Sequence, residues 1–439
     1  MLCLYSTWYK IIWICLMVAM TTIVGSAQKF VHCQGSNFVS EGHDYYYIGA
    51  NYWQGPLLAS EGQHGDRKRL IRELKALRKR GIKNLRILAG AEGPDHLPYR
   101  VTPTLQVAPG VYNDTLLQGL DFLLAKMGSL DMKAIIYLQN SWDWSGGIAQ
   151  YLQWNGYGDI QYMQNHTWEE YQAYNTKFYR SIPSQQQFEA HVKYMLSRTN
   201  TITGVAYIDD PTIMAWEIAN EPRAFSEANI PAFKRWISQT AALIKSIDKN
   251  HLVTTGSEGR IGCMNSLELF EEIHSDKNID YLTMHIWPKT WGWYDPKKLK
   301  EGWESAMVKT VKYIDEHIEV AKSLSKPIVL EEFGIARDSF GFDKKESTNM
   351  RDKYYQMCLQ IQMDQVINRG ALGGTNFWAY SGFAAQMNQD PFWQEGEAIA
   401  GDPPQEEQGL YGIYEGDSTL KVVSKYNKQL RKILRKRRK

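Results

Sequence analysis

The stretch that decides the fold of this 439-residue chain is Ala215-Trp216-Glu217-Ile218-Ala219-Asn220-Glu221-Pro222-Arg223. It belongs to a short, mainly apolar run over 213–219, which is typical of a buried parallel strand. Pro222 ends the run because proline has no N–H for a strand ladder. Asn220 and Glu221 are therefore predicted at the carboxyl end of a strand, where α/β folds hold their functional side chains.

A second apolar strand also runs into a carboxylate, in Pro327-Ile328-Val329-Leu330-Glu331-Glu332-Phe333-Gly334. Carboxylates at the ends of two strands of one sheet can face each other across a shared pocket. Cleavage of a glycosidic bond needs such a pair, with one carboxyl group protonated and the other ionised. The simpler alternative is that each is an ordinary solvated loop acid.

The two stretches resemble glycoside hydrolase family 5, whose members are retaining (β/α)8-barrel enzymes. Further motifs narrow the resemblance to the endo-β-1,4-mannanases of subfamily 7. These motifs are Gly49-Ala50-Asn51-Tyr52-Trp53, Ser141-Trp142-Asp143-Trp144-Ser145-Gly146-Gly147, Asn220-Glu221-Pro222-Arg223 and His285-Ile286-Trp287-Pro288. The matches extend from about Tyr45 to Ser381, so the resemblance covers nearly all of the chain after its first residues.

The order of strands and helices favours an α/β fold, a (β/α)8 TIM barrel in a single domain. The predicted strands are 45–51, 82–88, 133–138, 213–219, 252–255, 281–285, 328–332 and 374–379. The predicted helices are 66–80, 116–127, 186–197, 231–247, 303–323, 349–366 and 420–434. Long loops, 140–183 and 380–416, follow strands three and eight. Both are rich in aromatic residues and leave from carboxyl ends, so we expect them to wall a substrate cleft.

Residues 1–27 are predicted to be a signal peptide, and 28–439 the catalytic domain. Lys10 precedes an apolar run over 11–24, and the small residues Gly25, Ser26 and Ala27 follow it. The run is short for a membrane span, which needs about 20 residues. An uncleaved anchor is the alternative. We expect a secreted protein, extracellular, cell-surface or periplasmic, with no membrane contact after cleavage.

The net charge of +2 indicates neither nucleic acid nor a strongly charged polymer as a partner. Of the 15 tryptophans, all but Trp8 and Trp13 lie beyond the predicted signal peptide, which suggests a neutral polysaccharide as substrate. The family resemblance implies that this polysaccharide is a β-mannan. We expect a monomer.

The cysteines beyond the predicted signal peptide, Cys33, Cys263 and Cys358, lack metal-ligand spacing. The sequence also has no HExxH, paired CxxC or glycine-rich phosphate loop. No metal or organic cofactor is expected. The basic C-terminus is interpreted as a helix end fraying into a solvated tail, with attachment to an acidic surface as the alternative.

The resemblance gives each site residue a role. Glu221 matches the general acid/base, whose pKa should lie above that of a free carboxyl. Glu332 matches the nucleophile, and only one of Glu331 and Glu332 should face the mouth because successive strand residues point to opposite sides. Arg86 should hold Glu332 ionised. Asn220 matches the residue that bonds the sugar 2-hydroxyl.

The remaining matches concern sugar binding. His285 and Trp287 should lie near the two glutamates, although many family members have tyrosine where this chain has Trp287. Trp378 matches the indole under the reacting sugar, and Arg223 an arginine on the leaving-group side. Trp53, Trp142 and Trp291 are weaker candidates for substrate contact, and Glu217 is interpreted as a buried structural acid.

The resemblance implies a retaining endo-β-1,4-mannanase acting on mannan, glucomannan or galactomannan. Two alternatives remain. One is the same chemistry on another β-glucan, as in a cellulase (an endo-β-1,4-glucanase). The other is a non-catalytic carbohydrate-binding protein, against which the presence of both Glu221 and Glu332 argues.

Overall fold

Eight parallel strands form the central sheet of the computed structural model, which describes residues 30–95, 97–385 and 391–438. The strands are β4 (Tyr47–Asn51), β5 (Asn84–Leu88), β8 (Lys133–Tyr137), β9 (Ile213–Glu217), β10 (Leu252–Thr254), β11 (Leu282–Ile286), β12 (Ile328–Phe333) and β13 (Leu372–Phe377). Their order is β10-β9-β8-β5-β4-β13-β12-β11, so the first strand, β4, lies beside the last, β13. Hydrogen bonds from Asp280 N to Val253 O (2.8 Å) and from Thr254 Oγ1 to Tyr281 O (2.9 Å) connect β10 to the residues just before β11, so the two edge strands adjoin and the barrel is nearly closed. The predicted (β/α)8 barrel is confirmed.

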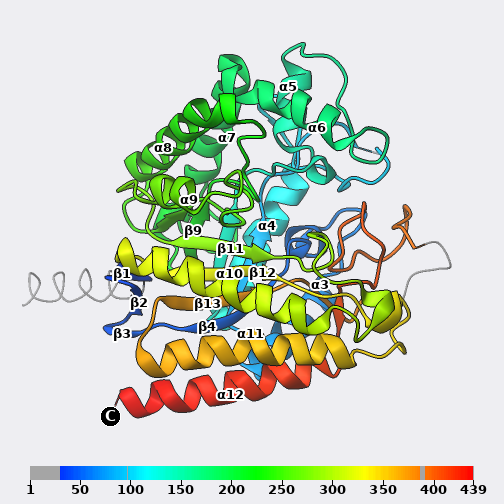
Figure 1. Cartoon of the computed structure of the whole chain (residues 1–439). Coiled ribbons are helices and arrows are strands. Elements are labelled where there is room, and N and C mark those ends of the chain that lie inside the picture. The colour runs from blue at the N-terminus through cyan, green and yellow to red at the C-terminus, as the bar shows by residue number, and fades with distance from the viewer. Residues whose placement is uncertain (1–29, 96, 386–390, 439) are drawn as a thin grey trace, which may run out of the picture.

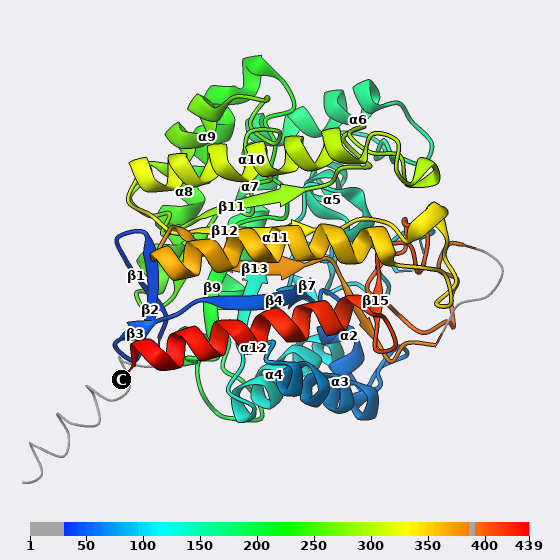
Figure 2. The ribbon, with the colours of Figure 1, turned by 60° about the horizontal axis from the view of Figure 1, so that its bottom comes forward.

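Helices surround this barrel, as Figures 1 and 2 show. They are α3 (Arg67–Arg80), α4 (Asp114–Ser129), α7 (Ile182–Leu196), α8 (Ile230–Ile247), α9 (Leu267–His274), α10 (Trp303–Ser323), α11 (Asn349–Asn368) and α12 (Thr419–Arg437). The first of them illustrates why they form. The Asp66 side chain caps α3 by accepting a hydrogen bond from Arg69 N, and Gly81 ends it with φ +88°. The predicted stripe of Leu70, Leu74 and Leu77 is buried against the sheet.

The amino ends of the strands are covered by a small three-stranded antiparallel sheet that the sequence did not indicate. It consists of β1 (His32–Gln34), β2 (Asn37–Ser40) and β3 (His43–Asp44). Phe38 is fully buried and packs with Tyr281 at a ring distance of 5.2 Å. Because these strands are short and half-exposed, their residues lack the apolar pattern by which the barrel strands were found.

The two long loops lie at the opposite end, where the strands finish. The loop after β8 folds into α5 (Gly147–Trp154) and α6 (Trp168–Asn175), and the loop after β13 contributes β14 (Tyr380–Gly382) and β15 (Ile413–Tyr414). In Figure 1 they gather at the right, whereas β1–β3 and the end of α12 lie at the left. The molecule thus has a mouth at the carboxyl ends of its strands and a closed base at their amino ends.

The predicted signal peptide lies outside the described residues. Within the ranges that the structure describes, no helix has both the length and the apolar character needed to cross a bilayer.

Candidate active site

The centre of the mouth is the guanidinium group of Arg86, near the end of β5. The side chain is completely buried, and it donates hydrogen bonds to Glu217 (Nε to Oε2, 2.8 Å), to Asn220 (Nη2 to Oδ1, 2.7 Å) and to Glu332 Oε1. Asn51, its register partner on β4, also accepts from Nη1 at 3.1 Å. Arginine is always charged, so it favours ionisation of the carboxylates around it.

Glu221 and Glu332 both approach Nδ1 of His285. Glu221 Oε1 is 2.7 Å from His285 Nδ1, and Glu332 Oε2 is 3.5 Å from the same nitrogen. One carboxyl oxygen of each glutamate and one ring nitrogen of His285 lie within 4.8 Å of one another. Glycosidases that form a covalent intermediate hold their carboxyl groups roughly 5–5.5 Å apart, whereas inverting enzymes need about 6.5–9.5 Å. The separation fits direct attack by one carboxylate.

Strand register explains why these residues meet. His285 on β11 pairs in register with Glu332 on β12, and Asn220, beyond the end of β9, bridges to Asn140 beyond the end of β8. Glu221 has φ +50°, a left-handed conformation that costs a non-glycine residue about 1–2 kcal/mol. Its N–H donates to Gly256 O at 2.9 Å, which helps to hold the turn. The strained backbone directs the Glu221 carboxyl group across the barrel mouth.

The pKa of Glu221 is lowered, whereas the sequence predicted that it would be raised. Burial alone would raise the pKa of Glu221, but the hydrogen bond and charge of His285 outweigh it, and the pKa is lowered. Burial raises the pKa of Glu332 to about 7, against the opposing charges of His285 and Arg86. The His285 pKa is raised to about 10, because the two glutamates outweigh its burial. Because both glutamates contact His285, the two carboxyl groups titrate together: below about pH 7 the pair holds one proton, which the leaving-group side requires on Glu221.

The expectation that Glu331 would face away from Glu332 is wrong. Glu331 is fully buried, and its Oε2 lies 3.7 Å from Arg86 Nε and 3.8 Å from His285 Nε2. The pairing of β11 with β12 shifts here, because Leu330 pairs with Met284 but Glu332 pairs with the next residue, His285. The extra residue in β12 breaks the alternation of side chains and adds a third carboxyl group to the centre.

One wall of the mouth is aromatic and carries Arg223. Trp142 Nε1 donates to Glu221 Oε2, and its ring stacks on Tyr171 (5.8 Å, 20°). The Arg223 guanidinium lies 5.1 Å from the Trp142 ring centre. It also forms two bonds to Glu258, of 2.5 and 2.7 Å, which fix its orientation. The structure thus places Trp142 and Arg223 beside Glu221. It also shows a site residue that was not predicted from the sequence, Glu258, which lies in the loop after β10, where no motif pointed to it.

The opposite wall contains Trp378, which follows β13, and Trp287, which follows β11. Their rings meet edge to face at 5.9 Å, and Trp287 also contacts Tyr411 from the long loop after β13, at 5.1 Å. Trp53 is 1% exposed, and its Nε1 donates to Gly401 O at 2.7 Å. Trp53 therefore anchors that loop.

The ring contacts of Trp291 are with residues other than the two glutamates. Its ring is 4.9 Å from Trp293 and 5.2 Å from Tyr313 of α10. Glu217 is buried and bonded to Arg86 through both oxygens, as a structural acid would be.

Comparisons with known proteins agree with this geometry. The model of the family described as "GH family 5 beta-mannosidase-like" matches residues 28–435. A mannan endo-1,4-beta-mannosidase 4 from Solanum lycopersicum is 30% identical over 369 residues, 81% of this chain and 84% of the relative. A mannan endo-1,4-beta-mannosidase 1 from Arabidopsis thaliana is 30% identical over 365 residues, 80% and 81% of the two chains.

Among solved structures, a glycoside hydrolase family 5 mannosidase from Rhizomucor miehei, in complex with mannosyl-fructose, has a TM-score of 0.87 and 35% identity, covering 93% of this chain and 99% of its own. Fold, carboxyl pair and family match agree: the chain belongs to glycoside hydrolase family 5, on its β-mannosidase-like branch, and is a glycoside hydrolase.

Proposed function

We propose that this protein is a secreted, retaining endo-β-1,4-mannanase that cleaves internal bonds of mannan, glucomannan and galactomannan. The observation that carries the proposal is the Glu221–Glu332 pair, whose oxygens lie within 4.8 Å beside a buried arginine. The substrate class comes from relatives named mannan endo-1,4-beta-mannosidases. Secretion is proposed because residues 1–27 have the sequence pattern of a signal peptide, and N-terminal sequencing of exported protein tests it.

The mechanism follows from this geometry in two displacements. Glu332 attacks the anomeric carbon while Glu221 donates a proton to the departing glycosidic oxygen, and a glycosyl-enzyme forms. Glu221 then removes a proton from water, which attacks the same carbon and releases Glu332. Asn220 is held by Arg86 and by Asn140, where it can bond the sugar 2-hydroxyl as charge develops.

The test of substrate class is release of reducing ends from unbranched mannan, glucomannan and carboxymethylcellulose by the same preparation. We expect activity on the first two, which Glu332→Ala should abolish. Greater activity on the cellulose derivative would contradict the mannanase proposal and support the endo-glucanase. Folded protein that cleaves none of the three would support the carbohydrate-binding alternative.

A second candidate is a β-mannosidase that acts from chain ends. Two observations favour it: the Rhizomucor miehei structure is named a mannosidase, and the residues Glu221 and Glu332 are only 6% and 3% exposed. An enclosed site suits a chain end better than a continuous chain.

The two modes differ in their products. An endo-acting enzyme should lower the viscosity of glucomannan before many reducing ends appear, and should cut mannohexaose into di-, tri- and tetrasaccharides. Release of mannose alone from the first minutes onward, with viscosity nearly constant, would decide for the chain-end mode.

The pH profile should report the shared proton. Since Glu332 has a pKa of about 7, we expect kcat/KM to fall as the pH rises through about 7, when the pair loses its proton. Replacing His285 by glutamine removes a positive charge that lowers both carboxyl pKa values, so the alkaline limb should move to higher pH as the overall rate falls. Initial rates between pH 3 and 10 measure both effects. An alkaline limb unmoved in His285→Gln would contradict the assignment.

A further inference from the structure

The positive charge of this protein is concentrated at its C-terminus. The last 22 residues contain ten of the 50 lysines and arginines and none of the 48 acidic residues. The rest of the chain therefore has 40 basic and 48 acidic residues, a net charge of −8. The near-zero net charge of the chain therefore conceals a strong separation of charge.

Helix α12 carries these cations on its outer surface. Its other side packs on the barrel through Leu420, Val423 and Leu430, which are buried. We define the basic face as Lys428, Arg431, Lys432, Arg435, Lys436 and Arg438. All of these except the half-buried Arg431 are exposed. Side chains three or four residues apart on a helix are roughly 5–6 Å apart, so the basic face is a regular row of cations.

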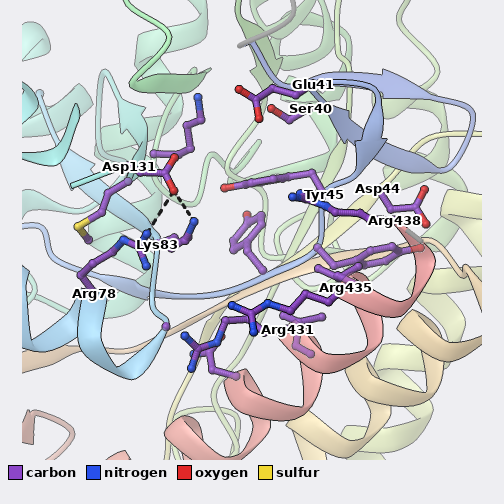
Figure 3. Close-up of a pocket in the computed structure, with 18 of the residues that line it drawn as sticks. Ser40, Glu41, Asp44, Tyr45, Arg78, Lys83, Asp131, Arg431, Arg435 and Arg438 are labelled. Atoms are coloured by element: carbon purple, nitrogen blue, oxygen red, sulfur yellow. Dashed lines mark hydrogen bonds and ion pairs between the residues drawn. The ribbon is translucent and has the colours of Figure 1, made fainter. Parts of the chain in front are cut away.

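Two hollows adjoin this row. One hollow, of about 600 Å³, lies between α12, the β3–β4 segment and the start of β8, and Figure 3 shows Arg431, Arg435 and Arg438 around it together with Arg78 and Lys83. The other, of about 560 Å³, is lined only by Lys428, Arg431, Lys432, Arg435 and Lys436. The two hollows share Arg431 and Arg435.

The carboxylates nearby are bound to other cations. Asp131 pairs with Arg78 (3.3 Å) and with Lys83. Asp44 pairs with Arg437 (3.0 Å) and Arg369 (3.4 Å). In the part of the chain that the structure describes, no ion pair joins a carboxylate to any residue of the basic face, and Glu41 is the remaining acid at the rim of the larger hollow. The face retains its positive charge for an external partner.

We propose that the basic face binds a linear acidic polysaccharide, a chain of uronic acids. Such a polymer presents one carboxylate per sugar at a regular spacing, which suits a regular row of cations with hollows along it. A bilayer is less suited, because Ile367 at the end of α11 is the single exposed large apolar side chain beside the row among the described residues. The face occupies the second half of α12, which runs along the flank of the barrel and ends at the base, away from the mouth (Figures 1 and 2). Binding there would hold the enzyme on an acidic matrix and leave its catalytic mouth open.

The test is affinity electrophoresis of the full chain through gels that contain polygalacturonate, fully methyl-esterified pectin or no polymer. The variant Lys428→Gln/Lys432→Gln/Arg435→Gln/Lys436→Gln removes four exposed cations from the face. The matched control, Lys249→Gln/Lys277→Gln/Lys309→Gln/Lys300→Gln, removes four exposed cations elsewhere. We expect retardation of the wild type and the control by polygalacturonate alone, at least about tenfold weaker binding of the face variant, and loss of binding at high salt.

Two further measurements make the result decisive. All three proteins should hydrolyse neutral mannan equally, which shows that the face variant is folded. Equal retardation of the face variant and the wild type, or no retardation of the wild type, would overturn the proposal. Stronger sedimentation of the wild type with phosphatidylserine vesicles than with insoluble polygalacturonate would also overturn it, in favour of a lipid surface.

Discussion

Glu332→Gln is expected to lower kcat on mannan by a factor of at least about 10,000, as removal of a covalent nucleophile does in other enzymes. Glutamine keeps the shape of the side chain, and its amide oxygen can still accept from Arg86 in place of Glu332 Oε1. The amide cannot form the glycosyl-enzyme, so the loss should fall on kcat rather than on KM. Steady-state rates on mannan, with circular dichroism to verify folding, measure the effect.

Glu221→Gln is the control that separates the two roles. It too should lose activity on mannan, because the departing sugar then has no acid to protonate it. On an aryl mannoside whose phenolate leaves without a proton, however, the first displacement should survive, and added azide should restore turnover by attacking the glycosyl-enzyme. Glu332→Gln should show neither effect. Azide rescue of Glu332→Gln instead of Glu221→Gln would reverse the assignment.

The sequence predicted these two residues because each lies where an apolar strand runs out, and the family resemblance selected Glu332 rather than Glu331. All eight barrel strands were found by the same signal, and the observed bounds differ by at most two residues at either end. Periodicity could not indicate Glu331, because its position depends on how β12 pairs with β11 and not on β12 alone. Glu258 was missed for a related reason, since its role depends on Arg223, 35 residues away.

The order of the carboxyl pKa values was also beyond the sequence. It depends on which oxygen His285 Nδ1 contacts, and this is a matter of ångströms rather than of residue type. The support that Trp53 gives to the loop after β13 was also beyond the sequence, because its partner Gly401 lies 348 residues later.

Arg86→Met should have the largest effect on stability. Arg86 is completely buried and bonded to Glu217, Asn220 and Glu332, so its loss leaves two carboxyl groups in the protein interior without their cation. Removing one partner of a buried ion pair costs about 3–5 kcal/mol of unfolding free energy. Urea unfolding, followed by tryptophan fluorescence, measures this loss.

Arg337→Met is the matched control, since Arg337 is equally buried and bonded through Nη2 to both oxygens of Asp417, at 3.0 and 2.7 Å.

The pH dependence distinguishes the catalytic arginine from an ordinary buried one. The Arg86 charge lowers the pKa values of Glu217 and Glu332, which burial raises to about 8 and about 7, and without it both values should rise further. A carboxyl group whose pKa is higher in the folded than in the unfolded state stabilises the fold while protonated and loses that contribution as the pH rises. The deficit of Arg86→Met relative to wild type should therefore be larger at pH 8 than at pH 6, and the folded fraction should lack activity at both. Arg337→Met should retain the wild-type kcat. An equal deficit of Arg86→Met at both pH values, with activity retained, would show that Arg86 only supports the fold and does not set the charge of the catalytic pair.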